Sequence, residues 1–255
     1  MGFLHEGHLS LVRKSKEICD ITIVSIFVNP IQFTPTEDLD KYPRNIERDS
    51  KLLQEQGVNY LFYPSVEKIY PKNFQTFINV EHITKQLEGE FRPTHFKGVT
   101  TVVNILFNCV NPDYAFFGQK DAQQAAVIKQ MVADLNMNIK IVVCPIVREP
   151  DGLAMSSRNI YLSKTEREDA LVLYKSLQAA IKSISNGERK STMIVSEMVS
   201  MITGVRSSKL DYVKIVDSKS FEMVEDLESD KEYYILIACK IGHTRLIDNE
   251  QVKIN

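Results

Sequence analysis

The chain has no long hydrophobic run, no paired cysteines and no strong excess of charge. Its longest apolar stretch, residues 233–239, is far shorter than the ~20 residues of a membrane-spanning helix, so we expect no membrane association. Four scattered cysteines without a C-x-x-C pair indicate a reduced, cytoplasmic protein and argue against a zinc site. We also expect no signal peptide, because Glu6 and His8 interrupt the apolar character of the first residues.

The composition describes an ordinary globular protein. The 255 residues carry a net charge of −2, which argues against a nucleic-acid-binding surface spread over the whole molecule. Hydrophobic residues make up 44% and charged residues 25% of the chain, enough for one large domain or two modest ones.

The segment His5-Glu6-Gly7-His8 precedes a helical pattern of apolar residues, Leu9, Val12 and Ile18. We predict a turn that brings both imidazoles to a helix N-terminus, where free N–H groups and the helix dipole favour a phosphate. Glycines 2 and 7 would let the backbone approach that anion. Two surface histidines at a helix end are the alternative.

Alternation of strands and helices predicts the fold class, an α/β protein. Strands are expected at residues 21–28, 58–63, 76–80, 113–117 and 139–144, with helices ending near residue 56 and covering 100–110 and 122–136. This predicts a Rossmann-like parallel-sheet domain over residues 1–147. Such a phosphate-binding turn commonly follows a strand, so we expect that the first strand is missing or that the turn is supported in another way.

A smaller α+β lid domain is predicted over residues 148–255. Amphipathic helices are expected at 164–185 and 190–203, and strands at 211–216, 233–241 and 245–247. The hinge would lie near residues 148–160.

Polar residues follow two predicted strands, where ligands bind in open α/β sheets. Asn29 and Gln32 follow the first and could bind a ligand or cap the next turn. Gly118 to Asp121 follows the strand at 113–117, so Lys120 could reach phosphate oxygens and Asp121 a hydroxyl or the helix N-terminus. Gln123 or Gln124 could face the same cleft.

Three further segments carry candidate functions. Residues 88–98 include Arg92, His95 and Lys97, a cluster suited to an anionic substrate or simply a solvated surface. The helix at 100–110 is apolar on almost every side, which indicates a core helix or an oligomer interface. The loop at 148–159 contains Ser156-Ser157-Arg158, which could clamp a triphosphate but alone is typical of a linker.

If these segments converge on one cleft, the chemistry they suit is attack on a nucleotide phosphate. Imidazole, lysine and guanidinium groups stabilise the charge that develops on the phosphates, and little covalent chemistry is asked of the protein.

Taken together, the motifs resemble the pantoate–β-alanine ligase family of the HxGH nucleotidyltransferase superfamily. The resemblance runs in order along the whole chain, through MGFLHEGH, VNPIQF, YPR, HFKGVTTVVN, FFGQKDAQQ, DGLAMSSRNIYL and finally RLIDN at residues 245–249. The family has a further strand before MG, so we expect that adding an upstream segment would raise activity.

The resemblance implies ATP-dependent condensation of (R)-pantoate with β-alanine through pantoyl adenylate, releasing AMP and pyrophosphate. Magnesium would be carried on the ATP phosphates without a protein metal site, and the protein would be a cytoplasmic homodimer. His8 would be the general acid, with His5 and Lys120 as catalytic residues beside it. The implied ATP-binding residues are Met1, Gly2, His5, Gly7, His8, Gly118, Gln119, Lys120, Asp121, Val147, Met155, Ser156, Ser157 and Arg158. The implied pantoate-binding residues are Gln32, Gln124, Asn29, Arg92, Val102, Val103 and Leu106, with Gln32 also near β-alanine.

Two other functions remain open at this point. One is another adenylyl- or cytidylyltransferase of the same superfamily, or a class I aminoacyl-tRNA synthetase fragment, although the chain has no basic tRNA-binding region. The other is a truncated member that binds ATP or pantoate without turnover.

Overall fold

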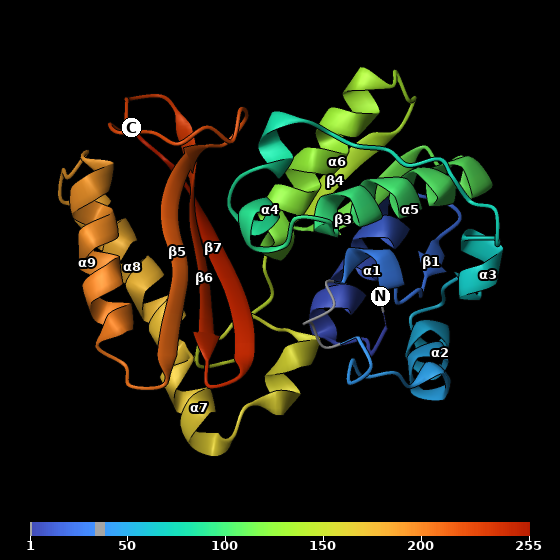
Figure 1. Ribbon diagram of the computed structural model, residues 1–255, viewed down its shortest axis with the longest axis horizontal. Helices are drawn as coiled ribbons and strands as arrows, with labels where there is room; N and C mark the ends of the chain where they lie inside the picture. Colours follow the sequence, from blue (N-terminus) through green and yellow to red (C-terminus); the bar gives the residue numbers. More distant parts are fainter. Residues whose placement is uncertain (1, 34–38) are drawn as a thin grey trace. The chain divides into compact units, whose positions relative to one another are not determined.

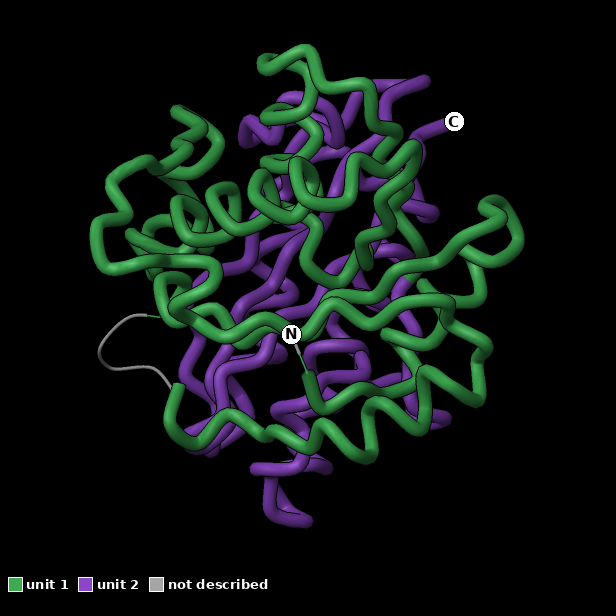
Figure 2. The backbone as a smooth tube through the Cα atoms, turned by 90° about the vertical axis from the view of Figure 1, so that its right-hand side faces the viewer, with its two compact units in different colours: residues 1–145 green, residues 146–255 purple. Residues whose placement is uncertain are grey.

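A computed structural model of the chain describes residues 2–33 and 39–255 (Figure 1). The chain divides into two compact units, residues 1–145 and 146–255 (Figure 2). The boundary predicted from the sequence lies two residues further along the chain. Each unit is described by itself below.

The first unit is built from short parallel strands and helices, which confirms the predicted α/β class. Strand β1 (Ile23–Ser25) pairs with β2 (Tyr60–Phe62), and β3 (Tyr114–Gly118) pairs with β4 (Lys140–Cys144), both in parallel. The helices are α1 (Glu6–Ile18), α2 (Ile46–Glu55), α3 (Val66–Ile69), α4 (Glu88–Phe91), α5 (His95–Val110) and α6 (Ala122–Asp134). Three 3-10 turns complete the unit: η1 (Pro30–Gln32), η2 (His82–Thr84) and η3 (Gln119–Asp121).

Two expectations about strands were wrong. The run at 21–28 forms only the three-residue β1, and the β-branched Ile21 and Ile23 are exposed rather than covered on both faces. Residues 76–80 form no strand among the described residues. The backbone of Ile78 is instead paired by side chains of α5: its N–H donates to the Thr101 hydroxyl at 3.1 Å, and its carbonyl accepts from the Thr100 hydroxyl at 2.7 Å.

The helix predicted at 100–110 begins earlier, at His95, and is largely a core helix. Val99, Val102 and Phe107 are buried, together with Val127 and Met131 of α6. Residues 88–98, predicted as a loop, form α4 and the start of α5. The helix α5 therefore stabilises the unit by burying apolar surface, and an interface role remains untested.

The second unit pairs a long antiparallel sheet with two helices. The sheet has the order β5 (Ser208–Asp217), β6 (Glu232–Ile241), β7 (Thr244–Lys253). The helices α8 (Leu171–Ser185) and α9 (Ser191–Thr203) pack on each other and on this sheet (Figure 1). Their apolar faces meet the sheet in a core of aliphatic side chains that are almost fully buried, including Leu177, Ile194, Ile235 and Ile237.

The helix predicted at 164–185 is divided in two. A separate α7 (Lys164–Asp169) precedes α8, and Ser163 caps it with a reciprocal bond to Glu166. The strands predicted at 211–216 and 245–247 are longer in the structure, since ladder pairing continues beyond the apolar residues. Among the described residues, no helix has the length and apolar character to cross a membrane.

Candidate active site

The His-x-Gly-His segment opens helix α1 as predicted from the sequence. His5 stands at the N-cap and His8 in the first turn, with ring centroids 4.0 Å apart. The His5 backbone N–H donates to Nδ1 of His8 at 3.2 Å. Since this nitrogen accepts, a neutral His8 carries its proton on Nε2. Nδ1 of His5 is buried without a hydrogen-bond partner among the described residues.

A carboxylate from α2 holds the turn before α1. Asp49 accepts from the backbone N–H of Phe3 at 2.6 Å and of Leu4 at 2.8 Å, and it pairs with Arg48 at 3.3 Å. Phe3 has a positive φ of 52°, which is unfavourable for a residue with a side chain. Buried Asp49 therefore holds the backbone of this turn in place. Sequence reasoning missed this residue, because nothing marks it among the charged residues of its helix.

Both histidines are held in the neutral form by their surroundings. Burial, followed by the positive charge of Lys120, lowers the pKa of His5 to about 4. Burial, followed by His5 and then Lys120, lowers the pKa of His8 well below its usual value. The imidazoles are therefore neutral at pH 7, and an arriving anion would raise both pKa values.

Lys120 and Asp121 lie in η3, directly after β3. Their side chains approach to 3.9 Å, and both act electrostatically on His5. Asp121 stands at the N-cap of α6, yet its side chain makes no capping hydrogen bond. The capping alternative is therefore wrong, and its carboxylate remains available for a hydroxyl group. A side chain added at Gly118 would meet open space.

Asn29 and Gln32 form a buried amide pair in η1. The Asn29 side chain donates to the Gly98 carbonyl at 3.0 Å and to Gln32 Oε1 at 3.3 Å. Its oxygen accepts from the Tyr70 hydroxyl at 2.9 Å and from the Ile31 backbone at 3.3 Å, so it caps the turn. Asn29 is thus arranged to orient Gln32, whereas its predicted contact with pantoate stays a prediction.

The predicted positive cluster at residues 88–98 separates into two kinds of residue. Arg92 Nη1 lies 3.3 Å from His95 Nε2, and His95 Nδ1 lies 3.0 Å from the Gln32 carbonyl oxygen. Because a guanidinium can only donate, Nε2 accepts and the Nδ1–H donates to Gln32. Lys97, by contrast, is exposed and lies over the ring of Phe77. Half-buried Arg92 and buried His95 fix Gln32, and only Lys97 fits the solvated alternative.

Close packing of α5 on η1 requires Gly98. A Cβ added there would lie 2.7 Å from the Gln32 backbone nitrogen, where no real side chain fits. Of the predicted pantoate residues on α5, Val102 and Val103 are buried and Leu106 is half-buried.

The two glutamines at the start of α6 have different roles. Gln123 is buried, accepts from the Glu88 N–H at 3.0 Å, and donates to the carbonyls of Ile83 and Gln86 at 2.7 and 2.8 Å. Gln124 is half-buried. Gln123 is therefore structural, and Gln124 is the glutamine suited to a ligand.

In the second unit, the predicted phosphate clamp is an ordered hairpin rather than a linker. The Met155 N–H donates to the Val147 carbonyl at 3.0 Å, and the Ser156 hydroxyl accepts from the Arg158 N–H at 3.2 Å. Ser157 is buried at the start of η4 (Ser157–Tyr161). His8 and Lys120 belong to the first unit and Arg158 to the second, so their convergence stays a prediction. The predicted ATP contact of Met1 lies outside the described residues.

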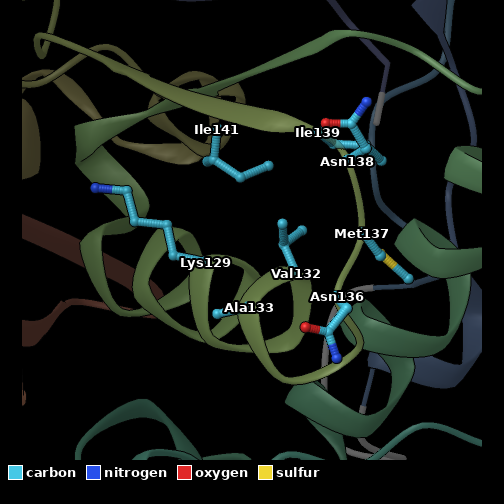
Figure 3. A pocket seen from close by; sticks show the side chains of 8 residues that line it. All are labelled: Lys129, Val132, Ala133, Asn136, Met137, Asn138, Ile139 and Ile141. Atoms are coloured by element: carbon cyan, nitrogen blue, oxygen red, sulfur yellow. The ribbon is translucent and has the colours of Figure 1, made fainter.

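One cavity lies apart from these residues. It has a volume of about 580 Å³ and lies between the C-terminal half of α6 and β4 (Figure 3). Its lining residues include Lys129, Val132, Met137 and Ile141, none of which we predict to bind ATP or pantoate. In residues 2–33 and 39–255, no cluster of three or more histidine, cysteine or acidic side chains could hold a metal ion.

Comparison with known proteins gives consistent matches along the chain. The pantothenate synthetase of Caldicellulosiruptor bescii is 56% identical over 98% of this chain and 88% of its own length. That of Thermotoga petrophila is 52% identical with the same coverage. The crystal structure of pantothenate synthetase from Thermus thermophilus has a TM-score of 0.95 at 42% identity, covering 99% of this chain and 91% of that one.

A structure of pantoate–β-alanine ligase from Francisella tularensis carries ligands. It is described as a complex with β,γ-ATP and β-alanine. Its TM-score is 0.78 at 37% identity, covering 98% of this chain and 86% of that one.

A parallel-stranded unit whose first helix opens on His-x-Gly-His defines the class, an α/β protein of the HxGH nucleotidyltransferase superfamily. Residues 1–251 match the family described as Pantoate-beta-alanine ligase. The chain belongs to the pantoate–β-alanine ligase family.

Proposed function

We propose that this chain condenses pantoate with β-alanine to form pantothenate at the expense of ATP. The observation that carries the proposal is the family match over residues 1–251, supported by relatives above 50% identity along the chain. It favours catalysis by this ligase over the other nucleotidyltransferases and over a binding-only role.

In the first step, a carboxylate oxygen of pantoate attacks the α-phosphorus of ATP. A new P–O bond forms, the bond to the β-phosphate oxygen breaks, and pyrophosphate leaves with the electron pair. We propose that Gln32 and Gln124 hold pantoate beside Val102, Val103 and Leu106. Buried His95 holds the backbone carbonyl of Gln32, and buried Asn29 holds its side chain. A Gln32 fixed in this way lowers the entropy that is lost when pantoate is positioned for attack.

Two groups of the first unit would stabilise the negative charge that develops on the phosphates. Lys120 supplies a positive charge, and His8 supplies an Nε2–H donor. We further propose that Arg158 and the hydroxyls of Ser156 and Ser157 bind the phosphates, as such groups do in general.

We propose that His8 acts as the general acid. Burial and the neighbouring His5 keep His8 neutral in the free protein. A bound triphosphate raises the pKa of His8, because negative charge stabilises the imidazolium. The proton acquired in this way can then pass to the departing pyrophosphate. His5, whose ring centroid lies 4.0 Å from that of His8, is proposed to bind a phosphate oxygen beside it.

In the second step, the β-alanine amine attacks the carbonyl carbon of pantoyl adenylate. The new C–N bond replaces the C–O bond, AMP leaves, and the amine loses a proton. Gln32 is proposed to lie near β-alanine as well as pantoate.

Three further features belong to this proposal. Mg²⁺ would arrive on the ATP phosphates and neutralise part of their charge. The protein would act as a homodimer. Its free cysteines fit the reducing cytoplasm.

The test is pyrophosphate release with ATP, pantoate and β-alanine, each omitted in turn. We expect release to require ATP and pantoate, with one equivalent formed without β-alanine, and AMP to form only with all three. His8→Ala should lower the rate at least about a hundredfold, whereas His243→Ala, at an exposed turn, should not. Release driven by an amino acid or sugar phosphate, or binding without turnover, would overturn the proposal.

A further inference from the structure

Arg148 connects three parts of the second unit through one guanidinium group. Nη1 and Nη2 bind the two carboxylate oxygens of Asp248 on β7 at 2.7 and 3.1 Å. Nη2 also lies 3.3 Å from the Asn249 carbonyl oxygen and 3.3 Å from Glu250. The guanidinium lies over the Tyr174 ring of α8, 4.7 Å from its centroid.

The same guanidinium holds the turn of the hairpin that carries the predicted clamp. Nη1 donates to the Gly152 carbonyl at 3.1 Å. Gly152 has a φ of +98°, and a Cβ there would lie 2.1 Å from the Tyr174 ring. The hairpin therefore lies against α8 so closely that only glycine fits. Three residues further on, Met155 begins the segment that ends at Arg158.

The charge of Arg148 is stable in this buried position. Its side chain is 16% exposed, and burial works against its charge. The hydrogen bond and attraction of Asp248 outweigh burial and raise the pKa of Arg148. Burial raises the pKa of Glu250 despite the nearby Arg148, so Asp248 is the principal partner.

These contacts connect two separated motifs of the chain. The segment at 148–158 carries Ser156, Ser157 and Arg158, while residues 245–249 carry no proposed ligand contact. Asp248 of the motif at 245–249 binds Arg148 of the segment at 148–158. The Asp248 carboxylate therefore supports the hairpin.

We infer that Arg148 is a positioning residue for the nucleotide: through Asp248 and Tyr174 it fixes the hairpin that presents Ser156, Ser157 and Arg158 to the ATP phosphates. This inference rests on the proposed function and extends it to residues that touch no substrate. A lysine would keep the charge but lose the two-pronged bond to Asp248.

The unit offers a matched control in the pair Arg245–Asp211. The two side chains meet at 2.7 Å, are 19% and 10% exposed, and join β7 to β5 within the same sheet. A substitution in this pair therefore measures the effect of weakening a half-buried ion pair elsewhere in the same sheet.

The experiment compares wild type, Arg148→Lys and Arg245→Lys in steady-state kinetics, thermal unfolding, and hydrogen exchange of the amides at 153–158. We expect Arg148→Lys to raise the KM for ATP roughly tenfold or more, since small displacements of a positioning group are costly. The KM for β-alanine should change by less than about twofold. General damage to the protein would instead change the KM of every substrate. Exchange at 153–158 should accelerate in Arg148→Lys alone.

Equal changes in the ATP KM for the two variants, or a loss of thermal stability alone, would overturn the inference while leaving the proposed function intact. Absence of pantothenate formation by wild type would overturn the proposed function and this inference with it. If Arg148→Lys does not fold, the inference is tested with Tyr174→Leu. That substitution removes the ring beneath the guanidinium and keeps the ion pairs of Arg148. We expect a smaller rise in the ATP KM for that variant, and an unchanged KM would contradict us.

Discussion

The two units of the chain are stabilised in different ways. The first has parallel strands of three to five residues, and its candidate site depends on polar groups such as Asp49 and Asn29, which hold segments far apart in the sequence. The second has antiparallel strands of ten residues over a core of buried aliphatic side chains. Polar substitutions at the candidate site of the first unit should therefore affect function most, and apolar substitutions in the core of the second unit should affect stability most.

The largest effect on activity should come from Lys120→Ala. Removing its positive charge from beside the histidines should lower turnover about a hundred- to thousandfold, because such groups stabilise developing charge. Steady-state kinetics measure this. Lys51→Ala, an exposed position of α2, is the control and should behave as wild type. Equal rates in the two variants would show that Lys120 does not act in catalysis.

The largest effect on stability should come from the second unit's core. Ile194→Ala, at a fully buried position of α9, should lower the free energy of unfolding by about 2–5 kcal/mol through lost burial and a cavity. Met193→Ala, at the neighbouring 60% exposed position, should cost less than about 1 kcal/mol. Denaturant titration measures both values, and similar losses would contradict the predicted difference.

An intermediate effect is expected from Asp49→Asn in the first unit. The substitution removes the charge from two hydrogen bonds and one ion pair. Unfolding free energy should fall by about 1–3 kcal/mol, and kcat/KM should fall more than stability alone explains, because the turn before α1 loosens. Glu47→Gln, exposed in the same helix, is the control. A loss of stability with unchanged kinetics would separate Asp49 from the site.

The last prediction concerns pH. The pKa of His5 is about 4 when folded and about 6.5 when unfolded, so the unfolded state binds a proton first as the pH falls. Stability is therefore fully present above pH ~6.5 and declines toward pH ~4. His5→Gln should reduce this decline. Denaturant titrations across this range test the difference, and parallel curves for His5→Gln and wild type would exclude the effect.

Local sequence patterns predicted the elements whose signals lie within a short stretch. The α/β class, the helix containing Val102 and the turn at Lys120 follow from apolar periodicity and strand-end chemistry. The strand predicted at 76–80 failed, because Thr100 and Thr101 on a distant helix take the backbone bonds of Ile78.

The candidate site could likewise be predicted only where a local motif marks the residue. Motifs identified His5, His8 and Gln124 as candidates, and yet the support from Asp49 and the choice between Gln123 and Gln124 depend on contacts that the fold creates. The neutral state of the histidines depends on burial, which no local pattern reports.

The measurement that tests the central claim most directly is NMR titration of the histidine rings, with and without Mg²⁺ and a non-hydrolysable ATP analogue. We predict a pKa of about 4 for His5 and a lowered pKa for His8 in the free protein. Both should rise when the nucleotide binds. Ordinary pKa values for His5 and His8 that do not respond to the nucleotide would contradict the account.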